Sequence, residues 1–113
     1  MKAHDAQPAI RILITNAPDA EVAARIGRAL VDERLAACVN VLAPCVSLYR
    51  WEGAVQQEQE VPMLIKTAEA TVHRAIERIA QLHPYDVPEV LSVATREGWA
   101  DYLRWVSAES TPD

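Results

Sequence analysis

The chain of 113 residues contains no phenylalanine, three glycines and two cysteines. Gly27, Gly53 and Gly98 lie too far apart to form a phosphate-binding loop or a dinucleotide fingerprint, both of which need clustered glycines. The thiols of Cys38 and Cys45 are too few for a disulfide framework. The sequence also lacks a Cys-x-x-Cys or His-Glu-x-x-His motif, so it does not predict a common type of zinc site.

Positive charge is scarce as well. Eleven Lys and Arg residues stand against sixteen Asp and Glu residues, which gives a net charge of −5. Nucleic acid is therefore not an expected partner, because phosphate binding needs clustered basic side chains. No apolar run approaches the ~20 residues of a membrane span, and the first eight residues lack the apolar core of a signal peptide. We expect a cytoplasmic protein with no membrane partner.

Apolar periodicity predicts one α+β domain over residues 1–113, with an ordered core at about 9–108 and short polar tails. The expected elements are a strand over 9–15, a helix over 19–34, two strand arms over 37–51 and 54–68, a helix over 69–82, a strand over 90–95 and a closing helix over 99–106. In that closing helix Trp99, Tyr102, Leu103 and Val106 share one face. The order β-α-β-β-α-β plus a C-terminal helix is that of a ferredoxin-like sandwich.

The two central arms form a hairpin too long for a compact monomer. At ~3.3 Å per residue each arm would span roughly 50 Å, whereas a compact chain of this length is roughly 35 Å across. A turn at Glu52-Gly53 pairs Trp51 with Ala54 and sets Pro44 opposite Val61, beside Pro62. We expect pairing to break on both arms at this level. An exposed two-stranded ribbon is marginal alone, so its tip should lie across another subunit of a homo-oligomer.

His83 is the first candidate functional residue. It begins a loop stiffened by Pro84 and Pro88, and Asp86 and Glu89 follow within it, so the three polar side chains could ligate a metal. The alternative is a structural histidine whose partial charge suits the end of a helix. Glu58 and Glu60 alternate onto one strand face, where they could form either a solvated edge or a weak cation site.

A second candidate set could line a cleft between subunits or simply anchor the interface; its aromatic members are Tyr49, Trp51, Tyr85, Tyr102 and Trp105. Lys66, in an apolar strand, is either an ordinary strand-end lysine or an anion-binding group between subunits. Cys38 is expected to be a buried structural thiol, because no cationic residue adjoins it in the sequence. No Ser-His-Asp or Cys-His pairing is readable, so we do not expect an enzyme.

These segments together resemble the CutA divalent-cation-tolerance family over residues 9 to 106. The resemblance rests on seven motifs, which are Ala17-Pro-Asp19, Leu35-Ala-Ala-Cys38-Val-Asn40, Ser47-Leu-Tyr49-Arg-Trp51-Glu-Gly53, Glu60-Val61, Lys66-Thr67, His83-Pro-Tyr85-Asp-Val-Pro-Glu89 and Tyr102-Leu-Arg-Trp105. It implies a ferredoxin-like homotrimer with a role in tolerance to divalent metals, copper above all, and with no established enzyme activity. The likeness of such trimers to PII signalling proteins implies an alternative, a regulatory module that binds a small anion or metabolite between subunits.

One departure bears on the metal. The copper site proposed for a bacterial member uses a cysteine at the end of the first strand and two adjacent histidines before Pro-Tyr. This chain has Thr15 at the first position and Leu82-His83 at the second. Imidazole and carboxylate donors alone suit Cu²⁺ or Zn²⁺ at modest affinity rather than Cu⁺.

Overall fold

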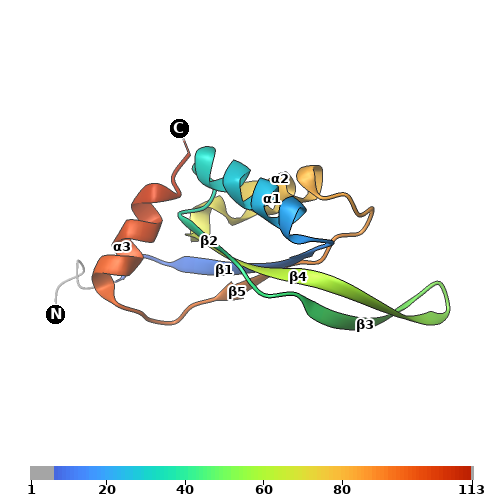
Figure 1. The fold of residues 1–113 in the computed structure, drawn as a ribbon. Helices are drawn as coiled ribbons and strands as arrows, with labels where there is room; N and C mark the ends of the chain where they lie inside the picture. Colours follow the sequence, from blue (N-terminus) through green and yellow to red (C-terminus); the bar gives the residue numbers. More distant parts are fainter. Residues whose placement is uncertain (1–6, 113) are drawn as a thin grey trace.

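The computed structural model describes residues 7–112. In chain order its elements are β1 (Ile10–Ala17), α1 (Ala20–Asp32), β2 (Cys38–Val41), β3 (Cys45–Trp51), β4 (Ala54–Ala68), the 3₁₀ turn η2 (Glu69–Thr71), α2 (Val72–Leu82), β5 (Val90–Ala94) and α3 (Ala100–Glu109). The strands form an antiparallel sheet in the order β2-β4-β1-β5, with β3 also paired to β4. Helices α1 and α2 cover one face of it, which confirms the α+β, ferredoxin-like prediction (Figure 1).

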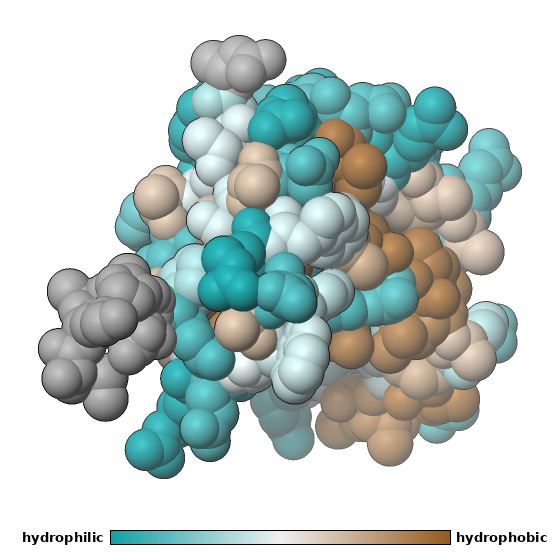
Figure 2. Space-filling view, turned by 90° about the vertical axis from the view of Figure 1, so that its left-hand side faces the viewer, coloured by the Kyte–Doolittle hydropathy of each residue, from teal (hydrophilic) through white to brown (hydrophobic). Residues whose placement is uncertain are grey.

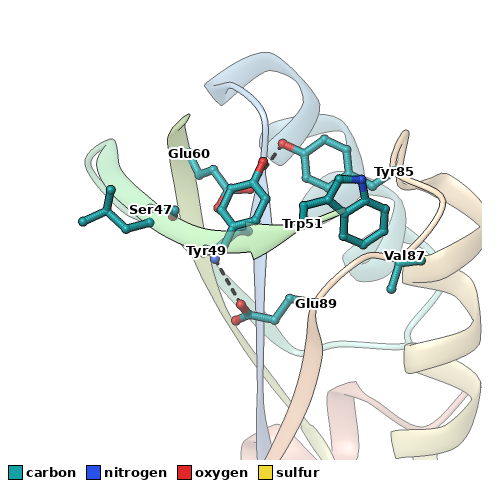
Figure 3. A pocket seen from close by; sticks show the side chains of 9 residues that line it. Ser47, Tyr49, Trp51, Glu60, Tyr85, Val87 and Glu89 are labelled. Atoms are coloured by element: carbon teal, nitrogen blue, oxygen red, sulfur yellow. Dashed lines mark hydrogen bonds between the residues drawn. The ribbon is translucent and has the colours of Figure 1, made fainter. Parts of the chain in front are cut away.

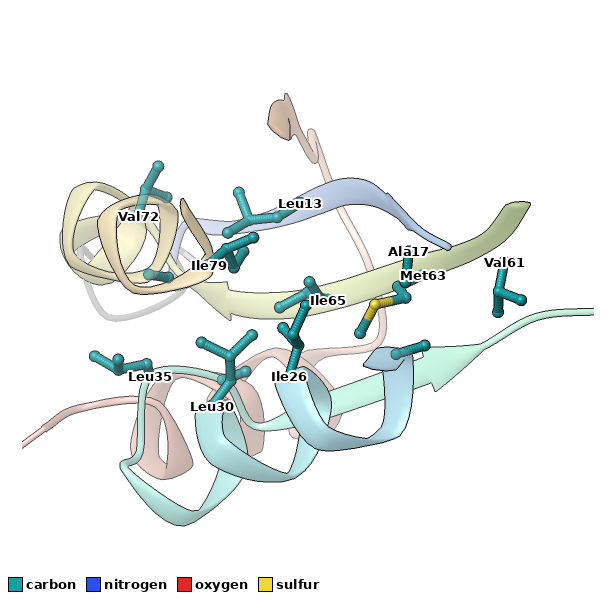
Figure 4. Close-up of a cluster of buried hydrophobic side chains, with 13 residues drawn as sticks. Leu13, Ala17, Ile26, Leu30, Leu35, Val61, Met63, Ile65, Val72 and Ile79 are labelled. Atoms are coloured by element: carbon teal, nitrogen blue, oxygen red, sulfur yellow. The ribbon is translucent and has the colours of Figure 1, made fainter. Parts of the chain in front are cut away.

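The main core lies between the sheet and its two helices. Alternate residues of β1 and β4, such as Leu13, Met63 and Ile65, face the apolar stripes of α1 and α2, where Ile26 and Ile79 are fully buried (Figure 4). Helix α1 begins where the Asp19 carboxylate accepts a hydrogen bond from the N–H of Val22 at 2.8 Å, a standard N-cap. Burial of one stripe per helix explains why the 3.6-residue periodicity located both helices correctly.

The hairpin projects beyond the sheet, as its length predicted. The described chain measures 55 × 26 × 23 Å, and the β3–β4 tip lies at the end opposite α3 (Figure 1). Pairing between the two arms is interrupted at the expected level, because residues 42–44 and 61–62 form no ladder pairs across the hairpin. Strand β4 runs through Pro62, because the φ of proline fits a strand and its carbonyl still accepts a hydrogen bond from Leu42 N–H at 2.9 Å.

The register changes by one residue between the two halves of the hairpin. Near the core, Val41 pairs with Met63, whereas at the start of the tip Cys45 pairs with Glu60. Three residues, 42–44, therefore oppose only two, 61–62, which is a bulge. The single register expected along the whole hairpin holds for the tip, where Trp51 pairs with Ala54, and is wrong at the base.

Helix α3 differs from its prediction at both ends. Trp99 precedes the helix and is exposed, so it does not share the buried face of Leu103 and Val106. The helix also continues through 107–109, beyond its predicted end at residue 106. The following Ser110 is fully buried, and its hydroxyl accepts a hydrogen bond from Ala68 N–H at 2.8 Å. A small polar side chain can thus anchor a segment that composition alone assigns to a tail.

The second face of the sheet is covered by a helix only at one end, where Leu103 and Val106 of α3 pack on Ile10; in the described part of the chain no helix lies over the rest of it (Figure 1). Two cross-strand rows of side chains lie on this face, which we call the open face: Leu91, Ile14, Leu64 and Asn40, and then Val93, Ile12, Lys66 and Cys38. Viewed from the α3 end, hydrophobic residues gather on one side of the molecule while the rest is mostly hydrophilic (Figure 2). Among the described helices none is long and apolar enough to cross a membrane.

Candidate functional site

A cleft with two lobes lies between the hairpin tip and the loop over residues 83–89. Both lobes are lined by Tyr49, Trp51, Tyr85 and Val87. The inner lobe, of about 370 Å³, adds Asn16, Ser47, Leu48, Glu60 and Glu89. The outer lobe, of about 490 Å³, adds Glu58, Pro84 and Asp86. We call the two lobes together the hairpin cleft; Figure 3 shows the inner one.

The turn of the hairpin decides which side chains face this cleft. Glu52 and Gly53 both have positive φ, 49° and 80°, as the tight turns favoured in two-residue hairpins require. This turn pairs Tyr49 with Gln56 and Ser47 with Glu58. Since directly paired residues lie on one face of a ribbon, the aromatic side chains of β3 share their face with the carboxylates of β4.

The opposite wall is held in place by His83. Its side chain is 6% exposed, and Nδ1 accepts a hydrogen bond from the backbone N–H of Tyr85 at 3.2 Å. The other ring nitrogen, Nε2, is therefore the one that donates, to the carbonyl of Asn16 at 2.6 Å. These two bonds tie the loop to the end of β1. The ring of His83 also packs on that of Tyr85, with centroids 4.6 Å apart.

Tyr85 joins the two walls of the cleft. Its hydroxyl donates a hydrogen bond to Oε2 of Glu60 at 3.2 Å (Figure 3). Desolvation, together with the negative charge and hydrogen bond of Glu60, raises the pKa of Tyr85 to about 12. The neutral phenol is favoured because ionisation would place a second negative charge beside the carboxylate.

The lining of the hairpin cleft is acidic. It includes four carboxylates and no Lys, Arg or His side chain; the acidic residues are Glu58, Glu60, Asp86 and Glu89. Glu60 is only 8% exposed, and within residues 7–112 the ion pairs that form involve other acids. A largely buried carboxylate whose hydrogen-bond partner is a neutral phenol creates a site that attracts cations.

The residues expected to ligate a metal are not brought together as one set of donors. Both ring nitrogens of His83 are engaged, so a metal could bind it only if a hydrogen bond to the loop or to β1 were broken. Glu89 accepts a hydrogen bond from Asn16 Nδ2 at 3.3 Å, and Asp86 is exposed in the outer lobe. Within the described residues no three His, Cys, Asp or Glu side chains form a group that could hold a metal. The imidazole site stays a prediction, and the geometry fits oxygen donors better.

The residues expected to line one intersubunit cleft divide into two groups in this chain. Tyr49, Trp51 and Tyr85 line the hairpin cleft. Lys66 lies on the open face near the base of the hairpin, where its ammonium donates a hydrogen bond to Asn40 Oδ1.

Tyr102 and Trp105 lie on α3, at the end of the molecule opposite the hairpin tip, and their rings pack 5.7 Å apart (Figure 1). Within one subunit, therefore, neither this aromatic pair nor Lys66 takes part in the cleft.

Cys38 is partly exposed, so the expectation of a buried thiol is wrong. It pairs with Lys66 on the open face, and a cationic residue therefore does adjoin it, across the sheet rather than along the chain. Its thiol also lies beside the phenol of Tyr102, whose pKa is raised by burial and by Cys38. The neighbours of Cys38 in the sequence could not reveal its contact with Lys66, because the two residues are 28 positions apart and meet only through cross-strand pairing.

Sequence reasoning missed Asn16, Ser47 and Val87 as lining residues. Ser47 had a usable signal, because it alternates with Tyr49 and Trp51 along one strand. Asn16 had none, since its place depends on the pairing of β1 with Pro62 of β4.

Three comparisons relate the chain to known proteins. The family described as CutA1 divalent ion tolerance protein matches residues 11–109. The "Divalent-cation tolerance protein CutA" of Thermus thermophilus is 43% identical over 95 residues, which cover 84% of this chain and 92% of that protein. The structure of CutA from Xylella fastidiosa has a TM-score of 0.88 and 42% identity, covering 90% of this chain and 98% of its own.

A more distant solved structure differs in its stated location. It is described as the periplasmic divalent cation tolerance protein CutA from Archaeoglobus fulgidus, with a TM-score of 0.87 and 27% identity over 90% of this chain and 99% of its own.

Proposed function

This chain belongs to the CutA1 divalent ion tolerance family, and we propose that it is a homotrimer that binds divalent cations weakly in the hairpin cleft, with the Glu60 carboxylate as the principal ligand. The observation that carries this proposal is the near-complete burial of Glu60 in a cleft lined by acids and free of basic side chains. The family's description names ion tolerance and no reaction. The residues that line the cleft include no activated nucleophile, so we propose a role in binding rather than in catalysis.

The donor set determines the kind of ion. Carboxylate oxygens from Glu60 and Glu89 are hard ligands, and the absence of a three-residue group in the described chain means that a bound ion keeps most of its water. Binding of Cu²⁺ or Zn²⁺ by so few protein ligands is then modest. Such an ion is a cargo that exchanges freely rather than a resident cofactor.

The trimer is supported by two apolar surfaces. On the open face, Leu91 and Val93 are about half exposed. On the hairpin, Val46 and Val55 are about two-thirds exposed on the face opposite Tyr49 and Trp51. Surfaces of this kind mark subunit contacts. Light scattering should give about three times the chain mass in a closed symmetric assembly; a mass that stays at one chain refutes it.

The alternative, a PII-like module that binds a small anion or metabolite, finds less support. Lys66, its anion-binding candidate, is hydrogen-bonded to Asn40 at the base of the hairpin, and the cleft is acidic. An anion site would need basic residues from a second subunit.

Calorimetry at neutral pH tests the ion site. Cu²⁺ and Zn²⁺ should bind the wild type and the control Glu52→Gln, which removes a charge from the hairpin turn outside the lining. Glu60→Gln should weaken binding at least about tenfold, a change of about 1.4 kcal/mol. In NMR spectra, broadening by paramagnetic Cu²⁺ should centre on the residues around Glu60 and Tyr85. Unchanged binding to Glu60→Gln, or broadening centred elsewhere, would refute the site.

The cytoplasmic location also stays a prediction. The solved relative described as periplasmic makes fractionation of the native cell the direct test.

A further inference from the structure

The outer lobe of the hairpin cleft differs in chemistry from the inner one. Three aromatic rings, those of Tyr49, Trp51 and Tyr85, line it together with the apolar Pro84 and Val87. The charged groups at this lobe are the carboxylates of Glu58 and Asp86. We propose that the outer lobe binds a small organic cation with an alkylated ammonium group, held by cation–π contact with the rings and by the two carboxylates.

One of the rings is fixed, and within this chain none of the three is covered. Tyr85 is held at its hydroxyl by Glu60 and along its ring by His83. Trp51 pairs across the hairpin with Ala54, whose methyl group is too small to cover an indole. In consequence Tyr49, Trp51 and Tyr85 remain 41%, 47% and 39% exposed. Three partly exposed rings in one cleft, one of them anchored through its hydroxyl, form an aromatic wall.

The chemistry of the lining selects the class of ligand. An alkylated ammonium group presents methyl groups that are positively charged and poorly hydrated, and aromatic faces attract them. A hydrated divalent ion gains little from such walls, because it needs oxygen ligands. An anion would meet Glu58 and Asp86 with no basic side chain in the lining to balance them. The volume of about 490 Å³ accommodates a small molecule.

This assignment does not depend on the metal site. It uses the aromatic side chains and the outer carboxylates, whereas the proposed metal ligands Glu60 and Glu89 line the inner lobe. A protein that fails to bind Zn²⁺ could still bind the organic cation, and the reverse also holds.

The test compares two probes of nearly the same shape, choline and its uncharged isostere 3,3-dimethylbutanol. Calorimetry or ligand-observed NMR on the intact oligomer should show that choline binds at least about tenfold more tightly, a difference of about 1.4 kcal/mol. Equal binding of the two probes, or no binding of choline at millimolar concentration, would overturn the proposal. This comparison uses the wild-type protein and does not depend on the folding of any variant.

Variants then locate the site. Trp51→Leu should weaken choline binding about tenfold and Trp51→Phe by less, because phenylalanine keeps a ring of weaker electrostatic attraction. Glu58→Gln should weaken it several-fold, whereas Glu52→Gln and Trp99→Leu, both outside the lining, serve as controls. Choline affinity that is unchanged in Trp51→Leu, or reduced equally in Trp99→Leu, contradicts the assignment.

Discussion

Replacing His83 by alanine separates two roles that the sequence left open, that of a metal ligand and that of a structural anchor. In the structure the ring is nearly buried and both of its nitrogens are hydrogen-bonded, to the Asn16 carbonyl and the Tyr85 N–H. The alanine variant leaves both backbone groups without these partners. It also removes the ring that packs against Tyr85. The loop over 83–89 then loses its attachment to β1.

The size of the effect follows from these contacts. An unsatisfied buried backbone group costs about 1–3 kcal/mol, and both groups here are only partly buried. Partial access of water to them lowers the sum, so we expect His83→Ala to reduce the free energy of unfolding by about 2–4 kcal/mol. His83→Gln should lose about half as much, because its amide can still donate to the Asn16 carbonyl.

Urea unfolding at one fixed protein concentration measures this loss, since oligomer stability depends on concentration. Calorimetry with Zn²⁺ and Cu²⁺ on the folded His83→Gln variant supplies the second reading. We expect a clear loss of stability and nearly unchanged ion binding. A His83→Ala protein as stable as the wild type that no longer binds either ion would show that His83 is the ligand. It would also refute the assignment of Glu60.

Three further predictions concern other parts of the fold. Because the pKa of Tyr85 is raised to about 12, the stability from its neutral phenol is complete below the ordinary value near 10 and is lost as pH rises through 12. Titration of phenolate absorbance in the wild type should show a tyrosine that ionises near pH 12, and Tyr85→Phe should lack this step. Ser110→Ala should cost about 1–3 kcal/mol in urea unfolding, because the buried N–H of Ala68 loses its acceptor. Gly53→Ala places a side chain at φ 80° and should destabilise the hairpin tip by about 1 kcal/mol, seen as faster hydrogen exchange there while amides of the core remain protected.

The sequence predicted the fold where each element buries one regular face. Helices α1 and α2 each have one apolar stripe, and strands β1 and β4 are largely apolar. The spacing of apolar residues along the sequence is therefore enough to locate these four elements. The predictions that were wrong concern residues whose position depends on tertiary contacts rather than on periodicity. Ser110 lies in a small, polar segment that composition assigns to the C-terminal tail, but its side chain is buried against β4 and α3. Trp99 reads as part of an apolar helix face but stands before the first turn, exposed.

The candidate site was predictable in its parts rather than as an assembly. The shared face of Tyr49, Trp51 and Glu58 follows from strand alternation and a two-residue turn. That Tyr85 reaches Glu60 does not, because it depends on where the loop after α2 crosses the end of β1. The metal role of His83 was predicted from the acidic residues in its loop and stays a prediction, whereas its hydrogen bonds to Asn16 and Tyr85 belong to the same long-range arrangement.

The bulge at residues 42–44 reconciles two requirements that one ladder cannot meet. Core packing fixes the base register, with Val39 opposite Ile65 so that both face α1 and α2. The turn fixes the tip register independently, one residue out of step. Because a shift of one residue moves a strand's side chains to the other face, the base register carried to the tip would set Leu48, not Tyr49, beside Gln56. The cleft therefore depends on the bulge. The bulge allows the turn to set the register of the tip, which places the aromatic side chains of β3 in the cleft, while the base of the hairpin keeps the register that core packing requires.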